Sequence, residues 1–137
     1  MNEAEARAAF TKARVARLAT LNPDGGPHIV PICFAVDGDV IYSAIDHKPK
    51  RSAHPQRLRN IMRDARVAVL ADHYDENWEN LCWIRADGRA RVVSAGEQAV
   101  ALLARRYAQY RERPPRGEMI VIDVARWSGW GNVAGTP

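Results

Sequence analysis

Residues 15–45, VARLATLNPDGGPHIVPICFAVDGDVIYSAI, contain three strand-like runs separated by two turn sequences. In the first turn, residues 22–26, proline fixes φ near about −65° and glycine accepts a positive φ, so the chain can reverse there. In the second, Asp37-Gly38 is a strong signal for a two-residue hairpin turn. These turns predict an antiparallel meander of three strands, over residues 15–21, 27–36 and 40–45.

The rest of the chain alternates helix-like and strand-like segments. Composition and periodicity predict helices over residues 3–13 and 96–113, and a third helix that opens at residues 52–55. The expected buried stripes are Leu58, Ile61, Met62 and Ala65 in the middle helix, and Val100, Leu103, Tyr107 and Tyr110 in the last. Three further strands are predicted over residues 66–74, 78–94 and 118–127. Asp87-Gly88 is compatible with either a hairpin or a bulge in one bent strand.

These elements predict a mainly β fold. Six strands with only short helices between them favour a closed or nearly closed antiparallel barrel over a parallel βαβ sheet, which would need more helix. The whole chain, residues 1–137, is expected to form one domain. Any sheet edge left open is commonly covered by a second copy of the chain.

The composition is that of an ordinary globular protein. With 137 residues, 47% of them hydrophobic, the chain can form a single core and is too apolar for a disordered protein. It has no apolar run of the roughly 20 residues that span a membrane and no secretory signal pattern, so we expect a cytoplasmic protein with no membrane partner. Cys33, Cys82 and the four scattered histidines lack metal-ligand spacing, which predicts reduced thiols and no metal site.

Positive charge is concentrated in one segment. Residues 48–66 hold seven Lys or Arg and a single Asp, a net charge of +6, whereas the whole chain carries +4 and the remainder is therefore net −2. A nucleic-acid-binding protein usually spreads its cations along a face that meets several phosphates, so this local cluster favours one phosphorylated small molecule. The alternative is a solvated basic helix face without a ligand.

Two prolines interrupt the strand predicted over residues 27–36. Because proline has no N–H to donate to a neighbouring strand, Pro27 and Pro31 indicate an edge, a bulge or a surface on which a flat ring could lie. An edge strand with nothing bound is also compatible with them. His28, which follows Pro27, is a candidate ligand contact, although a single histidine is more often an ordinary strand residue.

Two other segments stand out by their side chains. Residues 43–52 place hydroxyls and cations where a strand meets a helix, which suits a phosphate because charge-assisted hydrogen bonds and helix-start N–H groups converge there. They contain no P-loop or dinucleotide glycine motif. All four tryptophans lie within residues 78–83 and 126–131, where they are expected to cover a core edge, a subunit interface or a ring-shaped ligand.

No motif for catalysis by protein side chains alone is present. The chain has neither a GxSxG nucleophile motif nor an HExxH zinc motif, which argues against a hydrolase or a zinc enzyme. If the protein is an enzyme, its reactive group is therefore expected to be a bound organic cofactor. The sequence identifies no catalytic residue.

Several short motifs occur in a distinctive order between residues 5 and 130. They are RLATL at 17–21 followed by GPHIVP at 26–31, KPK at 48–50 with LRNI at 58–61, ARVAVL at 65–70, and the segment 78–88 followed by Ala90. In this order and spacing, the chain resembles the pyridoxamine-phosphate-oxidase-like, FMN-binding split-barrel superfamily. More narrowly, it resembles the deazaflavin-dependent (coenzyme F420) oxidoreductases of that superfamily.

The resemblance implies a six-stranded antiparallel split barrel in a homodimer, with the cofactor in a groove between the subunits. It implies that the cofactor's phosphate is held by Lys48, Lys50 and Arg51, with Ser43 nearby. The tricyclic ring would lie along the backbone of Val30, Pro31 and Ile32, with His28 as a candidate contact. Ile45 and Asp46 would line the polyol chain, and Arg57 and Asn60 would be second contacts. Trp78, Trp83 and Trp130 would lie at the interface or on the substrate side, from either subunit.

The implied function is hydride transfer between coenzyme F420 and an unsaturated small-molecule substrate, which requires stacking and orientation rather than a protein nucleophile. Tyr42, His28 or solvent could supply the proton. The alternatives are an FMN-dependent split-barrel oxidoreductase, and a non-catalytic protein that binds a flavin, or haem through a histidine such as His28 or His73. Vitamin B6 oxidation is not expected, because the chain is short and lacks the basic carboxy-terminal motif of those enzymes.

Overall fold

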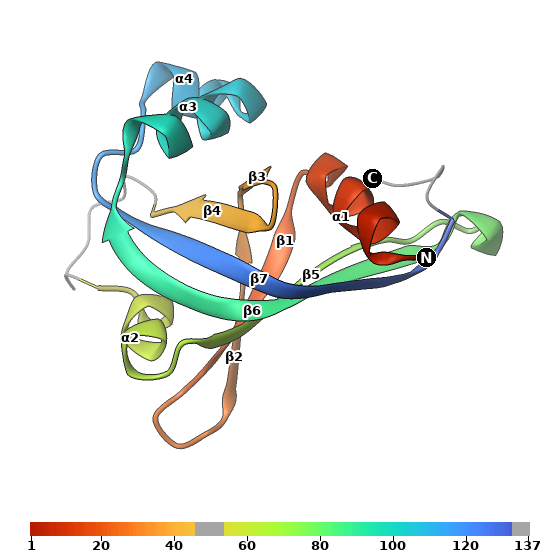
Figure 1. Ribbon diagram of the computed structural model, residues 1–137, viewed down its shortest axis with the longest axis horizontal. Helices are drawn as coiled ribbons and strands as arrows, with labels where there is room; N and C mark the ends of the chain where they lie inside the picture. The colour runs from red at the N-terminus through yellow and green to blue at the C-terminus, as the bar shows by residue number, and fades with distance from the viewer. Residues whose placement is uncertain (46–53, 133–137) are drawn as a thin grey trace.

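The computed structural model describes residues 1–45 and 54–132, and this part of the chain forms seven strands and four α-helices (Figure 1). The strands are β1 (Ala16–Leu21), β2 (Pro27–Ile32), β3 (Ala35–Asp37), β4 (Val40–Ala44), β5 (Arg66–His73), β6 (Cys82–Ser94) and β7 (Glu118–Gly131). The helices are α1 (Glu3–Lys12), α2 (Gln56–Arg63), α3 (Glu97–Arg106) and α4 (Ala108–Glu112), with one short 3₁₀ helix, η1 (Trp78–Asn80).

All seven strands belong to one antiparallel sheet in the order β2-β1-β5-β6-β7-β4-β3. The long strands β6 and β7 curve side by side across the molecule (Figure 1). The predicted mainly β barrel fold is confirmed, although the sheet is not closed within the described residues. The two hairpins of the predicted meander are present as β1–β2 and β3–β4. Its continuous middle strand is wrong, because residues 27–36 form β2 and β3, which stand at opposite ends of the strand order.

The sheet has seven strands rather than the predicted six because the expected strand over residues 27–36 breaks after Ile32. At the break, the Phe34 N–H donates to the Tyr107 hydroxyl at 3.1 Å and not to a neighbouring strand. The Phe34 side chain is fully buried, and its ring centroid lies 4.8 Å from that of Phe10. Burial of this ring turns the chain out of β2 and into β3, so one predicted strand becomes two.

Residues 82–94 form one bent strand and no hairpin. β6 pairs with β7 along its length, and the register shifts at Asp87/Gly88, which marks a β-bulge. Glycine is required at position 88 because a Cβ there would collide with the Asp123 carbonyl oxygen and lie 3.0 Å from the Cα of Val124. The bulge bends the β6–β7 ribbon, as curling a sheet toward a barrel demands.

Several element ends and faces differ from the prediction. β6 begins at Cys82 because residues 78–80 form η1, and β7 continues to Gly131, beyond the predicted end at residue 127. The predicted helix 96–113 divides at Tyr107, whose φ of −126° and ψ of 120° are extended. In α2, Leu58 and Ile61 are buried as expected, but Met62 is 55% exposed and the polar Asn60 is buried in its place.

The apolar core lies inside the curved sheet and is covered by α1 and α2. α1 begins at a capping box, in which the Glu5 N–H donates to Asn2 Oδ1 at 2.8 Å and the Asn2 N–H donates to Glu5 Oε1 at 3.0 Å. From α1, Phe10 packs against both Phe34 and Trp127. A second, smaller cluster joins α3 and α4 to β4 and β7. Among the described residues, no helix is long and apolar enough to cross a membrane.

Candidate functional site

A hollow of about 250 Å³ lies where the ends of β2 and β4 meet the two helices α2 and α4. Figure 1 places α2, the arrowhead of β4 and α4 along the same side of the molecule. The hollow is lined by Val15, Pro31, Ile32, Cys33, Ser43, Ala44, Arg57 and Tyr110. Four residues that the sequence marked as cofactor contacts therefore converge here, namely Pro31, Ile32, Ser43 and Arg57.

The wall formed by β2 is a sheet edge. In the described part of the chain, β2 pairs only with β1, where Pro31 stands opposite Arg17 and Pro27 opposite Leu21. The two prolines therefore occupy an edge strand, where their missing N–H leaves no ladder bond unmade. Side chains alternate along β2, so that Ile29 is exposed at 64% while Val30 packs against the core.

Ser43 reaches the hollow from β4, but its hydroxyl is already used within the protein. Its Oγ donates to the Cys33 carbonyl oxygen at 2.9 Å, and the residue is only 1% exposed. Because a hydroxyl has one hydrogen, this bond leaves Ser43 no proton to donate to a phosphate. Ile45, the next predicted contact, is half-buried against the core, and its N–H donates to the Glu118 carbonyl oxygen at 3.4 Å.

Arg57 is the cation that the hollow's described lining provides. It lies in the first turn of α2 and is half-buried. The other two arginines of α2 do not line the hollow: Arg59 donates to the His54 carbonyl oxygen at 2.6 Å and to the Gln56 side chain, and Arg63 donates to the Leu21 carbonyl oxygen. The predicted contacts Asp46, Lys48, Lys50 and Arg51 lie outside the described residues.

Asn60, predicted as a second cofactor contact, is fully buried. Its Nδ2 donates to Thr20 Oγ1 and to Asn22 Oδ1, both at 3.0 Å, and its Oδ1 accepts from Gln56 Nε2 at 2.8 Å. These bonds fasten α2 to β1 and to the turn that follows it. In this structure, Asn60 therefore orients the helix that carries Arg57.

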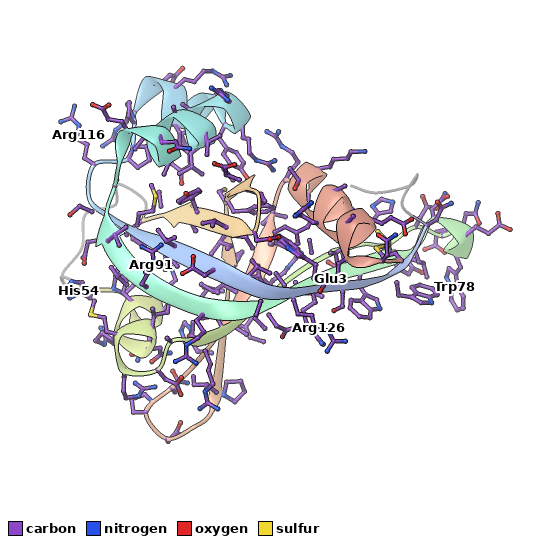
Figure 2. The ribbon with its side chains drawn as sticks, in the orientation of Figure 1. Glu3, His54, Trp78, Arg91, Arg116 and Arg126 are labelled. Carbon is purple, nitrogen blue, oxygen red and sulfur yellow. The ribbon has the colours of Figure 1, made fainter. Side chains whose placement is uncertain are left out.

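His28 and the tryptophans do not line the hollow. His28 is half-buried on β2, opposite Thr20, and its Nδ1 is a buried atom without a hydrogen-bond partner. Trp78 is 70% exposed and Trp130 is 55% exposed, and Figure 2 shows Trp78 at the end of the molecule opposite His54. With their neighbours they form a group, here called the aromatic tip, of Tyr74, Trp78, Trp83 and Trp130.

Trp127 has a different place from the other tryptophans. It is 4% exposed, and its Nε1 donates to Asp39 Oδ1 at 2.9 Å. This bond and the hydrogen bond from Arg7 lower the pKa of Asp39. The interpretation of the tryptophans as a core edge therefore holds for Trp127, whereas the aromatic tip is left in solvent by this chain.

The other shifted ionisable groups also lie away from the hollow. The Arg66 guanidinium and backbone N–H hold the pKa of Asp64 at about 2, in the turn between α2 and β5. The Asn77 N–H lowers the pKa of Asp75 beside η1, and burial raises the pKa of the Cys82 thiol. A carboxylate with a lowered pKa stays ionised near neutrality and is a poor proton donor, so Asp64 and Asp75 are assigned a structural role.

Four lining residues, Val15, Cys33, Ala44 and Tyr110, were not predicted as contacts from the sequence. Val15 lies between α1 and β1, Cys33 lies at the break after β2, and Tyr110 comes from α4. Tyr110 fitted an amphipathic helix pattern, which predicts burial and carries no sign that one edge of the ring meets a hollow. Cys33 and Ala44 could have been inferred as the chain neighbours of Ile32 and Ser43, whereas Val15 and Tyr110 come to the hollow from other parts of the chain and have no local signal.

Comparisons with known proteins agree with this architecture. A family model described as pyridoxamine 5'-phosphate oxidase matches residues 3–131. The structure of the conserved hypothetical protein Rv2991 from Mycobacterium tuberculosis has 25% identity and a TM-score of 0.76, over 100% of this chain and 89% of that one. No curated protein matches the chain significantly.

Two further solved structures share the fold at lower identity. One, named F420 reductase, has 22% identity and a TM-score of 0.65, over 89% of this chain and 94% of that one. HutZ, the haem storage protein from Vibrio cholerae, has 15% identity and a TM-score of 0.69, over 96% and 95%. One fold thus serves proteins with different cofactors. Because the family model spans nearly all of the described residues, the chain belongs to the pyridoxamine 5'-phosphate oxidase family.

Proposed function

We propose that this chain is an oxidoreductase that binds coenzyme F420 and transfers a hydride between it and an unsaturated small-molecule substrate. The observation that carries the proposal is the composition of the hollow, where a half-buried arginine lies beside the end of a proline-bearing edge strand. A cation next to a flat, largely apolar edge suits a ring with a phosphate tail. FMN, which has a shorter tail, is the runner-up on the same features.

The charge and the residue types of the hollow's lining suit such a cofactor. Arg57 would hold phosphate oxygens, with Lys48, Lys50 and Arg51 as the other proposed cations, and the backbone of residues 30–32 would lie along the ring. When bound, the cofactor supplies or accepts the hydride. The chain's own part is to hold the phosphate, to orient the ring and to exclude water from the substrate face.

We also propose that a second copy of the chain completes the site. Small-molecule pockets typically measure about 300–1,000 Å³ and enclose most of the ligand. The hollow of one chain is smaller, at about 250 Å³. The aromatic tip also leaves large apolar side chains in solvent, which is costly unless they are covered.

The charge distribution favours a pairing that places the aromatic tip of one copy against the α2 end of the other. Residues 72–79, which carry part of the tip, hold four carboxylates and no Lys or Arg, whereas α2 carries three arginines and no carboxylate. The two regions lie at opposite ends of the molecule (Figure 2). A twofold pair in which each acidic tip meets the partner's α2 would bring Asp75, Glu76 and Glu79 toward Arg59 and Arg63 and leave Arg57 to the cofactor phosphate.

Arg57→Ala is expected to weaken binding of F420 or FMN by about 1.5–3 kcal/mol, which is the contribution of a hydrogen bond to a charged group. Fluorescence titration of the purified protein measures the loss. Arg105→Ala, which removes an exposed arginine of α3 outside the hollow, is the matched control and should bind like the wild type. Equal affinity of the two variants would remove Arg57 from the site.

Trp130→Ser is expected to convert a dimer into a monomer and to weaken cofactor binding roughly tenfold, as truncation of a central interface aromatic does. Sedimentation equilibrium reports the mass, and the same titration reports the affinity. Lys12→Ala, at the exposed end of α1, should remain dimeric. A wild-type chain that sediments as a monomer with full cofactor affinity would contradict the proposed pairing.

Haem binding is a second candidate, and one observation favours it. His28 is half-buried on the edge strand β2, and an imidazole nitrogen can ligate haem iron. Parallel titrations of the protein with F420, FMN and haem separate the candidates. Haem binding that is lost in His28→Ala, with no flavin or deazaflavin binding, would favour the haem candidate over the oxidoreductase.

A further inference from the structure

One peptide group beside the hollow is held on both sides by side-chain hydroxyls. It joins Cys33 to Phe34, at the break between β2 and β3. The Ser43 hydroxyl donates to its carbonyl oxygen at 2.9 Å, and the Tyr107 hydroxyl accepts from its N–H at 3.1 Å. The two hydroxyls come from β4 and from the junction of α3 and α4, so distant parts of the chain take the place of a neighbouring strand.

The Tyr107 hydroxyl is itself fully engaged. Besides accepting from Phe34, it lies 2.9 Å from the Arg14 carbonyl oxygen and 3.1 Å from the Phe34 carbonyl oxygen. Its single proton is donated to one of these two acceptors at a time. The hydroxyl therefore ties the break between β2 and β3 to the segment that precedes β1.

Two arginines hold the ring of Tyr107 in place. The guanidinium carbons of Arg14 and Arg106 lie 5.2 and 5.5 Å from its ring centroid. Arg14 donates to the Arg106 carbonyl oxygen at 2.7 Å, and Arg106 donates to the carbonyl oxygens of Thr11 and Ala13. Each arginine thus satisfies carbonyl groups at the carboxyl end of a helix, Arg14 on α3 and Arg106 on α1.

We propose that Tyr107 is a positioning residue of the cofactor site. The hydroxyl pair from Tyr107 and Ser43 sets the orientation of the Cys33–Phe34 peptide, and that peptide follows directly on Pro31 and Ile32 in the wall of the hollow. Tyr107 does not touch the cofactor but keeps the wall in the shape that the ring requires. This role rests on the proposed binding of a flat cofactor in the hollow.

The test compares Tyr107→Phe, which keeps the ring and removes only the hydroxyl, with Ser43→Ala and with the double variant. Amide hydrogen exchange at Phe34 measures, without any cofactor, how firmly the two hydroxyls hold the Cys33–Phe34 peptide. Fluorescence titration with F420 and FMN measures affinity. We expect faster exchange at Phe34 in Tyr107→Phe and a roughly tenfold loss of affinity, the effect of about one hydrogen bond. Because both hydroxyls hold one peptide, the double variant should lose less affinity than the product of the two single losses.

Ile84→Val controls for lost stability, because Ile84 is fully buried in β6 and does not line the hollow. If Ile84→Val lowers the urea midpoint as much as Tyr107→Phe does and still binds the cofactor with wild-type affinity, then lost stability alone does not weaken binding.

Faster exchange at Phe34 with wild-type affinity in both Tyr107→Phe and Ser43→Ala would overturn the positioning role and leave the proposed function standing. A wild type that binds neither F420 nor FMN would overturn the proposed function, and the positioning role with it. Should Tyr107→Phe fail to fold, Arg14→Ala takes its place, because it removes a guanidinium that lies over the Tyr107 ring and leaves the lining of the hollow unchanged. Faster exchange at Phe34 with weaker cofactor binding would support the positioning role, and faster exchange with wild-type affinity would overturn it.

Discussion

Gly88→Ala is expected to lower the free energy of unfolding by about 2–4 kcal/mol, because the new methyl group meets backbone that cannot move aside. Gly88 stands at the bulge where the register between β6 and β7 shifts. A Cβ at this position would collide with the Asp123 carbonyl oxygen and lie 3.0 Å from both the Asp123 carbonyl carbon and the Val124 Cα. Relief requires the two longest strands of the sheet to separate locally, and urea unfolding followed by circular dichroism measures the loss.

Gly117→Ala is the matched control for this substitution. No heavy atom lies within 4 Å of a Cβ built on Gly117, and its φ is outside the range that favours glycine. The control is therefore expected to be as stable as the wild type or slightly more so, since alanine restricts the unfolded chain. If both variants unfolded at the same urea concentration, close approach of β7 would not be the reason for glycine at position 88.

Asn60→Ala is expected to destabilise the protein by about 2–3 kcal/mol, because it empties a buried volume and leaves buried polar groups without partners. The Asn60 amide connects Gln56 in α2 to Thr20 in β1 and to Asn22 in the following turn. Without it, the connection of α2 to β1 loses its buried hydrogen bonds, and the Arg63 bond to the Leu21 carbonyl oxygen and the apolar contacts of Leu58 and Ile61 remain. Urea unfolding measures the loss, and F420 or FMN affinity is expected to fall as well, because α2 carries Arg57.

Met62→Ala separates this effect from a general weakening of α2. Met62 lies two residues further along the same helix and is 55% exposed, so its truncation should change stability by no more than about 0.5 kcal/mol. Affinity for the cofactor should also remain at the wild-type level. A loss in Met62→Ala as large as that in Asn60→Ala would argue against the buried amide as the link between α2 and the sheet.

Much of the secondary structure follows from short-range patterns. The turn at residues 22–26 occurs where it was predicted, and the hairpin turn predicted at Asp37-Gly38 forms one residue later, at Gly38 and Asp39, where Gly38 adopts a φ of +59°. The helix near the amino terminus begins at an Asn2–Glu5 capping box. These features depend on residues within a few positions of one another, so the linear sequence contains the information.

The pairing of the strands did not follow from such patterns. Residues 27–36 have the composition of a single strand, yet burial of Phe34 and the Tyr107 hydroxyl divide them into β2 and β3. The two halves then join opposite ends of the sheet. Both contacts connect residues far apart in the chain, and no window of local sequence contains them.

In the candidate site, too, some features could be predicted from the sequence and others could not. The prolines of β2 and the cation at Arg57 could be identified from residue type, because proline cannot donate to a ladder and a local cluster of cations attracts a phosphate. The structural roles of Asn60 and Ser43 could not be identified in this way, because both side chains form their hydrogen bonds within the protein. The four tryptophans were identified from the sequence as an unusual group, but the burial of Trp127 and the exposure of the other three are properties of the folded chain.

By itself, then, the sequence determined the mainly β class, the family resemblance and the residue types suited to a phosphorylated ring, because each depends on composition, spacing or neighbours in the chain. Only the tertiary structure decided the order of the seven strands, the bulge at Gly88 and the clamped Cys33–Phe34 peptide. These three features depend on which residues, far apart in the sequence, can be buried together while their polar atoms keep hydrogen-bond partners. That requirement involves the whole chain and cannot be evaluated from a short segment.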